Sequence, residues 1–161
     1  MKEITLPFER EKTCCFTGHR TLPFDPTLLP NLEQSIRDLA AKGITCFCAG
    51  GALGFDTLAA RTVLRLKATE LAELSLVLIL PYPDQASQWS KKNIAAYEAI
   101  KENADQVIYV SQKYDFMCMQ RRNRCLVDVS SHCICYLRHK TGGTAYTVRY
   151  AKEQGLSLLL L

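Results

Sequence analysis

Large apolar residues recur along the chain in six short runs that scarcely alternate with polar residues. Runs of this kind are typical of strands covered on both faces, as in a parallel sheet between two layers of helices. We therefore expect strands over residues 14–17, 44–49, 76–80, 106–110, 133–137 and 156–161.

Between these runs, apolar residues lie three or four positions apart, which is the spacing of a helix that buries one face. Leu32, Ile36 and Leu39 are an example, and Gly43 and Gly155 follow the first and last predicted helices as stop signals. Strands and helices alternate and the order ends on a strand. The pattern predicts an α/β fold: a single doubly wound, Rossmann-like, mostly parallel sheet of about six strands with helices on both faces.

The length of 161 residues suits one domain over residues 1–161, because the expected strands, helices and connections use up the chain. Hydrophobic residues make up 48% and charged residues 22%, which favours a packed globular protein over a disordered one. The formal net charge of +4 is too small to argue by itself for nucleic acid as a partner.

The chain contains eight cysteines, most of them inside the apolar runs. We interpret them as reduced core thiols of a cytoplasmic protein, since paired Cys-x2-Cys motifs that would indicate zinc do not occur. No apolar run approaches the length of a membrane span, and the start at Met1, Lys2 and Glu3 does not lead into a signal-peptide core. We expect no metal and no membrane association.

Three turns after predicted strands carry the residues that point to chemistry: 17–20, 50–56 and 138–144. Ligands of open α/β sheets bind beyond the carboxyl ends of the strands, so these turns should open on one edge. Two of them are rich in glycine and precede a helix, an arrangement that brings backbone N–H groups and the positive end of the helix to a phosphate. The spacing matches neither the dinucleotide fingerprint nor the Walker loop, and glycine also serves tight turns without any ligand.

Several single residues have two interpretations each. Asp56 is placed either to cap the second helix or to bind a ribose hydroxyl, and Thr144 either to cap the last helix or to contact a phosphate. Trp89 either stacks on a base or covers the sheet edge, and His19 either donates to a ligand or is simply exposed.

An arginine cluster lies early in the fourth predicted helix, where the helix dipole disfavours cations. It consists of Arg121, Arg122 and Arg124. A bound phosphate would offset this charge, and so would a pair between Arg124 and Asp128 four residues later.

In these residues the chain resembles the YpsA-like family of the SLOG superfamily, almost from end to end. Five blocks occur in the family's order: Phe16-Thr17-Gly18-His19-Arg20, Ala52-Leu53-Gly54-x-Asp56, Pro81 with Gln85 and Trp89, Arg122-Asn123 through Asp128, and Gly142-Gly143-Thr144 through Ala151. The resemblance implies a doubly wound sheet and a nucleotide or nucleotide-derived ligand.

Related enzymes of the superfamily, the lonely-guy phosphoribohydrolases, carry a G-G-x-G-T-x-x-E block. This chain departs from that block, because Thr147 stands where the acidic residue would fall. Hydrolysis of an N-glycosidic bond passes through an oxocarbenium-like state that requires a carboxylate, and Asp56 or Asp128 would have to supply it.

The function that these observations favour is cytosolic binding of a nucleotide or nucleotide-derived phosphate ligand, as a sensor or regulatory module. One alternative is a nucleoside-monophosphate phosphoribohydrolase with Asp56 and Arg122 as catalytic residues, and another is single-stranded DNA binding. The apolar last strand also leaves an edge that a homodimer could cover. The predicted ligand-binding residues are Thr17, Gly18, His19, Arg20, Gly50, Gly51, Gly54, Asp56, Gln85, Trp89, Arg122, Asn123, Gly142, Gly143 and Thr144.

Overall fold

The computed structural model describes residues 9–161. Met1, Lys2 and Glu3, on which the expected lack of a signal peptide rests, lie outside these residues. Among the described residues, no helix is long and apolar enough to cross a bilayer.

Six strands form one sheet in the order β4-β3-β2-β1-β5-β6, and every neighbouring pair is parallel. The strands are β1 (Thr13–Gly18), β2 (Cys46–Ala49), β3 (Ser75–Leu80), β4 (Gln106–Tyr109), β5 (His132–Tyr136) and β6 (Ser157–Leu160). Each lies within two residues of a predicted strand, which confirms the single doubly wound sheet.

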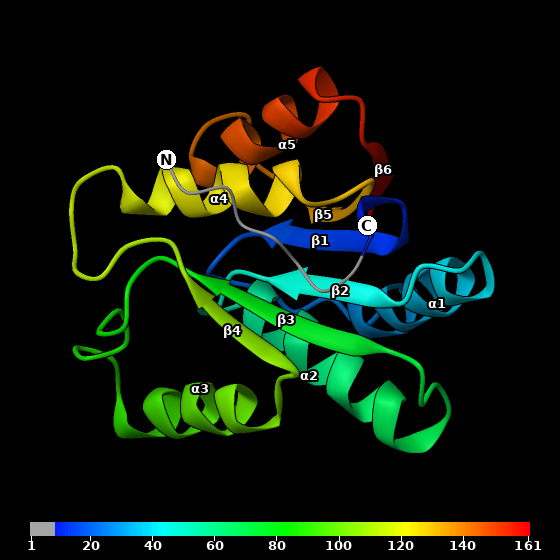
Figure 1. Cartoon of the computed structure of the whole chain (residues 1–161), viewed down its shortest axis with the longest axis horizontal. Coiled ribbons are helices and arrows are strands. Elements are labelled where there is room, and N and C mark those ends of the chain that lie inside the picture. Colours follow the sequence, from blue (N-terminus) through cyan, green and yellow to red (C-terminus); the bar gives the residue numbers. More distant parts are fainter. Residues whose placement is uncertain (1–8) are drawn as a thin grey trace.

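Helices cover both faces of the sheet (Figure 1). The helices are α1 (Leu28–Ala41), α2 (Phe55–Thr69), α3 (Lys91–Asn103), α4 (Cys118–Asp128), α5 (Gly143–Glu153) and the short 3-10 helix η1 (Arg10–Lys12). The apolar faces of α1, α2 and α3 pack on one side of the sheet, and those of α4 and α5 pack on the other.

The strand β1 shows why the apolar runs lack alternation. Cys14 and Phe16 belong to the core under α1 and α2, whereas Cys15 belongs to the core under α4 and α5, and all three are fully buried. Successive side chains of a strand point to opposite faces, so a strand between two cores carries apolar side chains on both faces instead of alternating with polar ones.

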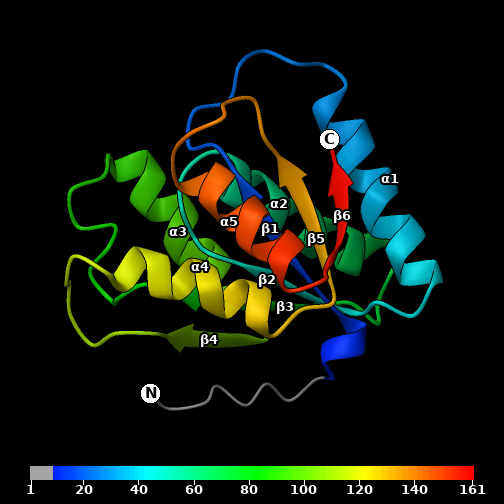
Figure 2. The same ribbon diagram turned by 90° about the horizontal axis from the view of Figure 1, so that it is seen from above.

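The strand order reverses between β1 and β5. The chain leaves β1 for a helix on one face and leaves β5 for a helix on the other face, as the view from above shows (Figure 2). The two connections diverge at the carboxyl ends of these neighbouring strands, and a crevice opens between them.

Candidate functional site

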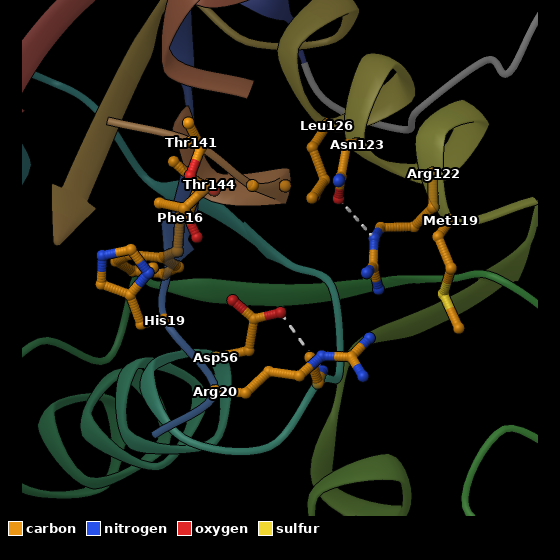
Figure 3. A pocket seen from close by; sticks show the side chains of 15 residues that line it. Phe16, His19, Arg20, Asp56, Met119, Arg122, Asn123, Leu126, Thr141 and Thr144 are labelled. Atoms are coloured by element: carbon orange, nitrogen blue, oxygen red, sulfur yellow. Dashed lines mark hydrogen bonds between the residues drawn. The ribbon is translucent and has the colours of Figure 1, made fainter. Parts of the chain in front are cut away.

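A cleft of about 320 Å³ occupies this crevice (Figure 3). Its walls come from the end of β1, the β2–α2 loop, one face of α4 and the start of α5. The lining residues are Phe16, Thr17, Gly18, His19, Arg20, Ala52, Asp56, Met119, Arg122, Asn123, Leu126, Thr141, Gly142, Gly143 and Thr144. Ten of the fifteen predicted ligand-binding residues are therefore brought together in one place.

The β2–α2 loop is packed directly against the β1–α1 loop. The backbone N–H of Phe55 donates to the carbonyl of His19 at 3.0 Å. Gly54 has a φ of +76°, and a Cβ at this position would lie 2.2 Å from the backbone oxygen of Arg20. Only a glycine permits this approach, so Gly54 joins two loops rather than facing a ligand.

The other two glycines of this loop also meet protein atoms. A Cβ on Gly51, whose φ is +72°, would lie 2.3 Å from the side chain of Leu80 and 3.0 Å from that of Gln85. A Cβ on Gly50 would lie 2.8 Å from Arg122 Nη1 and 3.0 Å from Asp56 Oδ2. Gly50, Gly51 and Gly54 do not line the cleft, and we leave them out of the site because the protein's own side chains and backbone fill the space beside them.

Gln85 and Trp89 lie behind the same loop. The side-chain amide of Gln85 donates to the carbonyl of Gly51 and to the hydroxyl of Tyr97, both at 3.3 Å. Trp89 packs edge-on against Tyr97, with ring centres 5.4 Å apart. Neither residue lines the cleft. Their side chains contact the β2–α2 loop and α3 rather than the cleft, so we do not count them among the site residues.

Asp56 and Arg122 form the polar floor of the cleft. Asp56 is 7% exposed and accepts the backbone N–H of Ala52 through Oδ2 at 3.2 Å. Burial raises the pKa of its carboxyl, although the positive charge of Arg122 acts in the opposite direction. The structure therefore places a buried carboxyl group and a buried cation beside the same face of Gly50.

Arg122 is only 4% exposed, yet it forms no ion pair with any carboxylate of residues 9–161. Its Nη1 donates to the carbonyl of Gly50, and its Nε donates to Asn123 Oδ1 at 2.8 Å. Burial lowers the pKa of the guanidinium, and the carboxylate of Asp56 opposes this shift. A buried guanidinium without a carboxylate in contact is an uncommon and costly arrangement.

The start of α5 forms the wall opposite this floor. The helix begins after Gly142, which has a φ of +98°, and Cβ atoms on Gly142 or Gly143 would meet almost nothing within 4 Å. Among the described residues, the backbone N–H groups of Gly143, Thr144 and Ala145 have no hydrogen-bond acceptor. The first turn of a helix leaves such groups free, and here they open into the cleft.

Two capping predictions are wrong. The cap of α2 is Gly54, with Asp56 at the second position of the helix, and the cap of α5 is Gly142, with Thr144 also at the second helical position. In both cases the glycine conformation at the turn starts the helix one or two residues before the polar side chain.

The predicted pair between Arg124 and Asp128 is also wrong. Arg124 donates to the hydroxyl of Tyr146 at 2.8 Å, and its guanidinium lies 5.0 Å from the ring centre of Tyr150. The hydroxyl of Tyr150 donates to Asp128 at 2.6 Å, and this bond raises the pKa of Tyr150 to about 12. These contacts fasten α4 to α5, the two helices that supply one side of the cleft.

Five lining residues were missed by the sequence interpretation: Phe16, Ala52, Met119, Leu126 and Thr141. For two of them the signal was available, because Met119 and Leu126 stand three residues before and four residues after Arg122 and so share its face of the helix. In the part of the chain that the structure describes, no group of three or more His, Cys, Asp or Glu side chains could hold a metal ion.

Comparison with known proteins gives a family, several relatives and two solved folds. The sequence model of the YspA SLOG family matches residues 26–157. A UPF0398 protein of Halalkalibacterium halodurans is 31% identical over 159 residues, covering 96% of this chain and 82% of its own. A UPF0398 protein of Bacillus cereus is 26% identical over 158 residues, covering 89% and 84%.

Two solved structures with a similar fold are of DNA processing protein A. The protein from Helicobacter pylori, described with a single-stranded DNA binding mode, superimposes with a TM-score of 0.66 at 18% identity and covers 92% of this chain. The protein from Streptococcus pneumoniae superimposes with a TM-score of 0.66 at 16% identity and covers 93%. This chain spans 64% and 50% of their lengths, and the likeness at such identities is one of fold.

Proposed function

The chain belongs to the YspA SLOG family, and from this membership and the chemistry of its cleft we propose that it binds a nucleotide or nucleotide-derived ligand through a phosphate group. The observation that carries the proposal is the pairing of free amides at the start of α5 with a buried guanidinium that has no ion-pair partner among residues 9–161. Both features favour an anion, and both line the same cleft.

The phosphate would rest on the amides of Gly143 and Thr144. Asn123 lies beside them, because a Cβ on Gly143 would be 4.0 Å from Asn123 Nδ2. Since Asn123 Oδ1 accepts from Arg122, its amide nitrogen is left to donate. Arg20 is exposed at the rim of the cleft and would add positive charge.

The rest of the ligand would extend toward the floor. Asp56 is the one carboxylate among the lining residues, and it would accept hydrogen bonds from sugar hydroxyls. A volume of about 320 Å³ lies at the lower end of the range of small-molecule sites, about 300–1,000 Å³. The enclosed part of the ligand would therefore be about the size of a mononucleotide.

Calorimetric titration with AMP, ATP, NAD, ADP-ribose and a cyclic dinucleotide tests this function. A ligand that binds should bind about tenfold or more weakly to Arg20→Ala, because a hydrogen bond to a charged group is lost. Arg149→Ala is the matched control, since Arg149 is exposed on α5 and does not line the cleft. Silence across the whole panel would contradict the proposal.

Hydrolysis of an N-glycosidic bond is less favoured than binding. Enzymes of this kind commonly use two carboxyl groups, whereas the cleft has Asp56 alone. Thr147, at the position of the missing acid, is buried and donates its hydroxyl to the carbonyl of Gly143 at 2.8 Å. Chromatography of nucleoside monophosphates incubated with the protein would detect a released base.

Single-stranded DNA binding is a second candidate, and an exposed aromatic loop favours it. Tyr114 and Phe116, just before α4, are 62% and 84% exposed. The loop is nevertheless fixed, because Asp115 accepts hydrogen bonds from Met117 N–H at 3.0 Å and from both terminal nitrogens of Arg121 at 3.0 and 2.5 Å. Exposed rings just before α4, the helix whose Met119 lines the cleft, could stack on bases, and two solved proteins of similar fold carry the name DNA processing protein A.

Fluorescence anisotropy with a labelled oligothymidine at several salt concentrations tests the second candidate. Binding should weaken as salt rises and should be reduced in Tyr114→Ala and Phe116→Ala. Leu160→Ala, on the edge strand β6 and 65% exposed, is the control for loss of an exposed apolar group. Absence of binding at low salt would exclude this candidate.

A further inference from the structure

His19 contacts all three loops that meet at the cleft. It follows β1, its carbonyl accepts the N–H of Phe55, where the β2–α2 loop enters α2, at 3.0 Å, and its ring nitrogen Nε2 accepts the N–H of Arg138 from the β5–α5 segment at 2.7 Å. The ring also lies 4.6 Å, centre to centre, from that of His139. No other lining residue bonds to both neighbouring loops within residues 9–161.

The bond to Arg138 fixes the protonation of the ring. A backbone N–H can only donate, so Nε2 must carry a lone pair and the single proton of a neutral imidazole must be on Nδ1. Figure 3 shows one ring nitrogen directed toward the β5 side and the other toward the interior of the cleft. Among residues 9–161, Nδ1 has no hydrogen-bond partner.

We propose that His19 works as a neutral imidazole that holds the β5–α5 segment through Nε2 and donates its Nδ1–H to an anionic ligand in the cleft. The first half concerns the free protein, and the second half rests on the proposed function. Through the segment it holds, His19 also positions the start of α5, whose free amides face the same ligand.

The charged groups around the ring favour the neutral form. From the β5–α5 segment it faces Arg138 and His139, and burial together with these two neighbours lowers the pKa of His19 below its ordinary 6.5. Asp25, from the loop before α1, lies 3.9 Å from the guanidinium of Arg138. The remaining charged groups near the ring are Asp56 and Arg20, which line the same cleft.

Nitrogen NMR of the imidazole rings in the free protein tests the first half without any ligand. At neutral pH the ring of His19, identified by its loss in His19→Gln, should show a protonated Nδ1 and an unprotonated Nε2. The amide of Arg138 should be protected from hydrogen exchange. A proton on Nε2, or on both nitrogens, at this pH would overturn the proposal.

Two substitutions separate the two roles. His19→Gln can place an amide oxygen near the position of Nε2, which keeps the acceptor for Arg138 but removes the donor. His19→Asn can place an amide nitrogen near the position of Nδ1, which keeps a donor but removes the acceptor. We expect the Arg138 amide to stay protected in His19→Gln and to lose protection in His19→Asn. The reverse result would overturn the assignment of the two nitrogens.

Binding of inorganic sulfate tests the second half, because sulfate, a strong-acid anion, keeps its charge over the pH range in which histidine titrates. At neutral pH, His19→Gln should bind sulfate more weakly than wild type by about tenfold or more, the effect of losing one hydrogen bond to a charged group. His132→Gln, at the far end of β5, is the control and should bind as wild type does.

The pH dependence of sulfate binding shows whether protonation of His19 weakens or strengthens binding. Relative to His19→Gln, wild type should lose affinity for sulfate as the pH falls below the pKa of His19, because a proton on Nε2 breaks the bond to Arg138. A relative gain of affinity would show that His19 serves as a cation and would overturn the proposal. If the free protein shows the expected tautomer and sulfate does not bind, the donor role and the proposed anion site both fail while the tether stands.

Discussion

Single residues decide how closely the loops around the cleft approach one another. Gly54 is the clearest case, since its φ is +76° and a Cβ atom there would lie 2.2 Å from the backbone of Arg20, which leaves no room for a side chain. The contact joins two loops 34 positions apart in the sequence (54 − 20 = 34). A glycine that looked like part of a phosphate loop is a packing residue.

We predict that Gly54→Ala costs about 3 kcal/mol or more in the free energy of unfolding, because strained backbone and overlap with a fixed main chain add together. Gly155→Ala is the control: its φ is +81°, but a Cβ there meets nothing within 4 Å, so the cost should be limited to the backbone strain of about 1–2 kcal/mol. Urea denaturation measures both. Equal costs would show that the contact with Arg20 is unimportant.

Asp56 gives a prediction about pH. Its pKa in the folded protein is raised by burial above the ordinary 3.8, so the folded state holds this proton more tightly than the unfolded state does. The contribution to stability is therefore fully present below the unfolded pKa and is lost as the pH rises through the folded pKa.

Asp56→Asn lacks this titration. Measured against it, wild type should lose stability as the pH is raised from about 3.8 toward neutrality, by about 1.4 kcal/mol for each tenfold change in the acid constant. Thermal unfolding of both proteins at a series of pH values gives the difference. A difference that grows in favour of wild type with rising pH would mean that Arg122 outweighs burial.

At the level of helices and strands, α3 matters for the site although it does not line it. Tyr97 of this helix holds Gln85, and Gln85 holds the carbonyl of Gly51, so α3 supports the β2–α2 loop. Ser90 caps the helix through a hydrogen bond from Asn93 N–H to its hydroxyl at 3.2 Å. Within residues 9–161, none of the other α-helices has a side-chain cap.

We predict that Ser90→Ala destabilises the protein by about 1 kcal/mol, the usual cost of losing such a cap. Ser87→Ala, at an exposed position in the same connection, should change the free energy of unfolding by less than about 0.5 kcal/mol. Chemical denaturation of both variants provides the comparison. If the two changes are equal, the cap contributes nothing beyond ordinary surface effects.

For the whole molecule, the strands and helices were predictable from local pattern, because burial on both faces makes β1, β2, β3 and β5 largely apolar, with the few polar residues mostly at their ends. The meeting of three loops at one edge was predictable from topology alone. The contacts inside the site were not. The bond between His19 and Arg138 spans 119 positions, and no local signal reports which ring nitrogen it uses.

The same limit explains the misplaced residues. Glycine at a turn signals an unusual backbone conformation but not what lies beside it. A Cβ on Gly142 would have no atom within 4 Å, whereas a Cβ on Gly51 would overlap with the side chain of Leu80. Similarly, a tryptophan in a loop indicates an aromatic contact, but the sequence does not show which residue it contacts. For Trp89 this residue is Tyr97.

The cysteines allow a prediction about the entire fold. All eight are free, seven are buried, and the half-buried Cys125 has a pKa raised to about 11 by burial. Reaction with a disulfide reagent requires an accessible thiolate. We predict slow labelling of at most Cys125 in the native protein and labelling of all eight thiols in denaturant, counted by absorbance. Rapid labelling of several thiols without denaturant would contradict the buried arrangement.

Five strand cysteines belong to the core under α4 and α5, and three of them form a row across the sheet, because Cys15 is paired in register with Cys48 on β2 and with Cys133 on β5. Once the chain opens, they are released together into solvent, where oxygen can link them in combinations that the native sheet does not accommodate. Thermal unfolding in air should therefore be irreversible, because the cooled protein keeps non-native disulfides. With a reductant in the buffer, the same protein should refold on cooling.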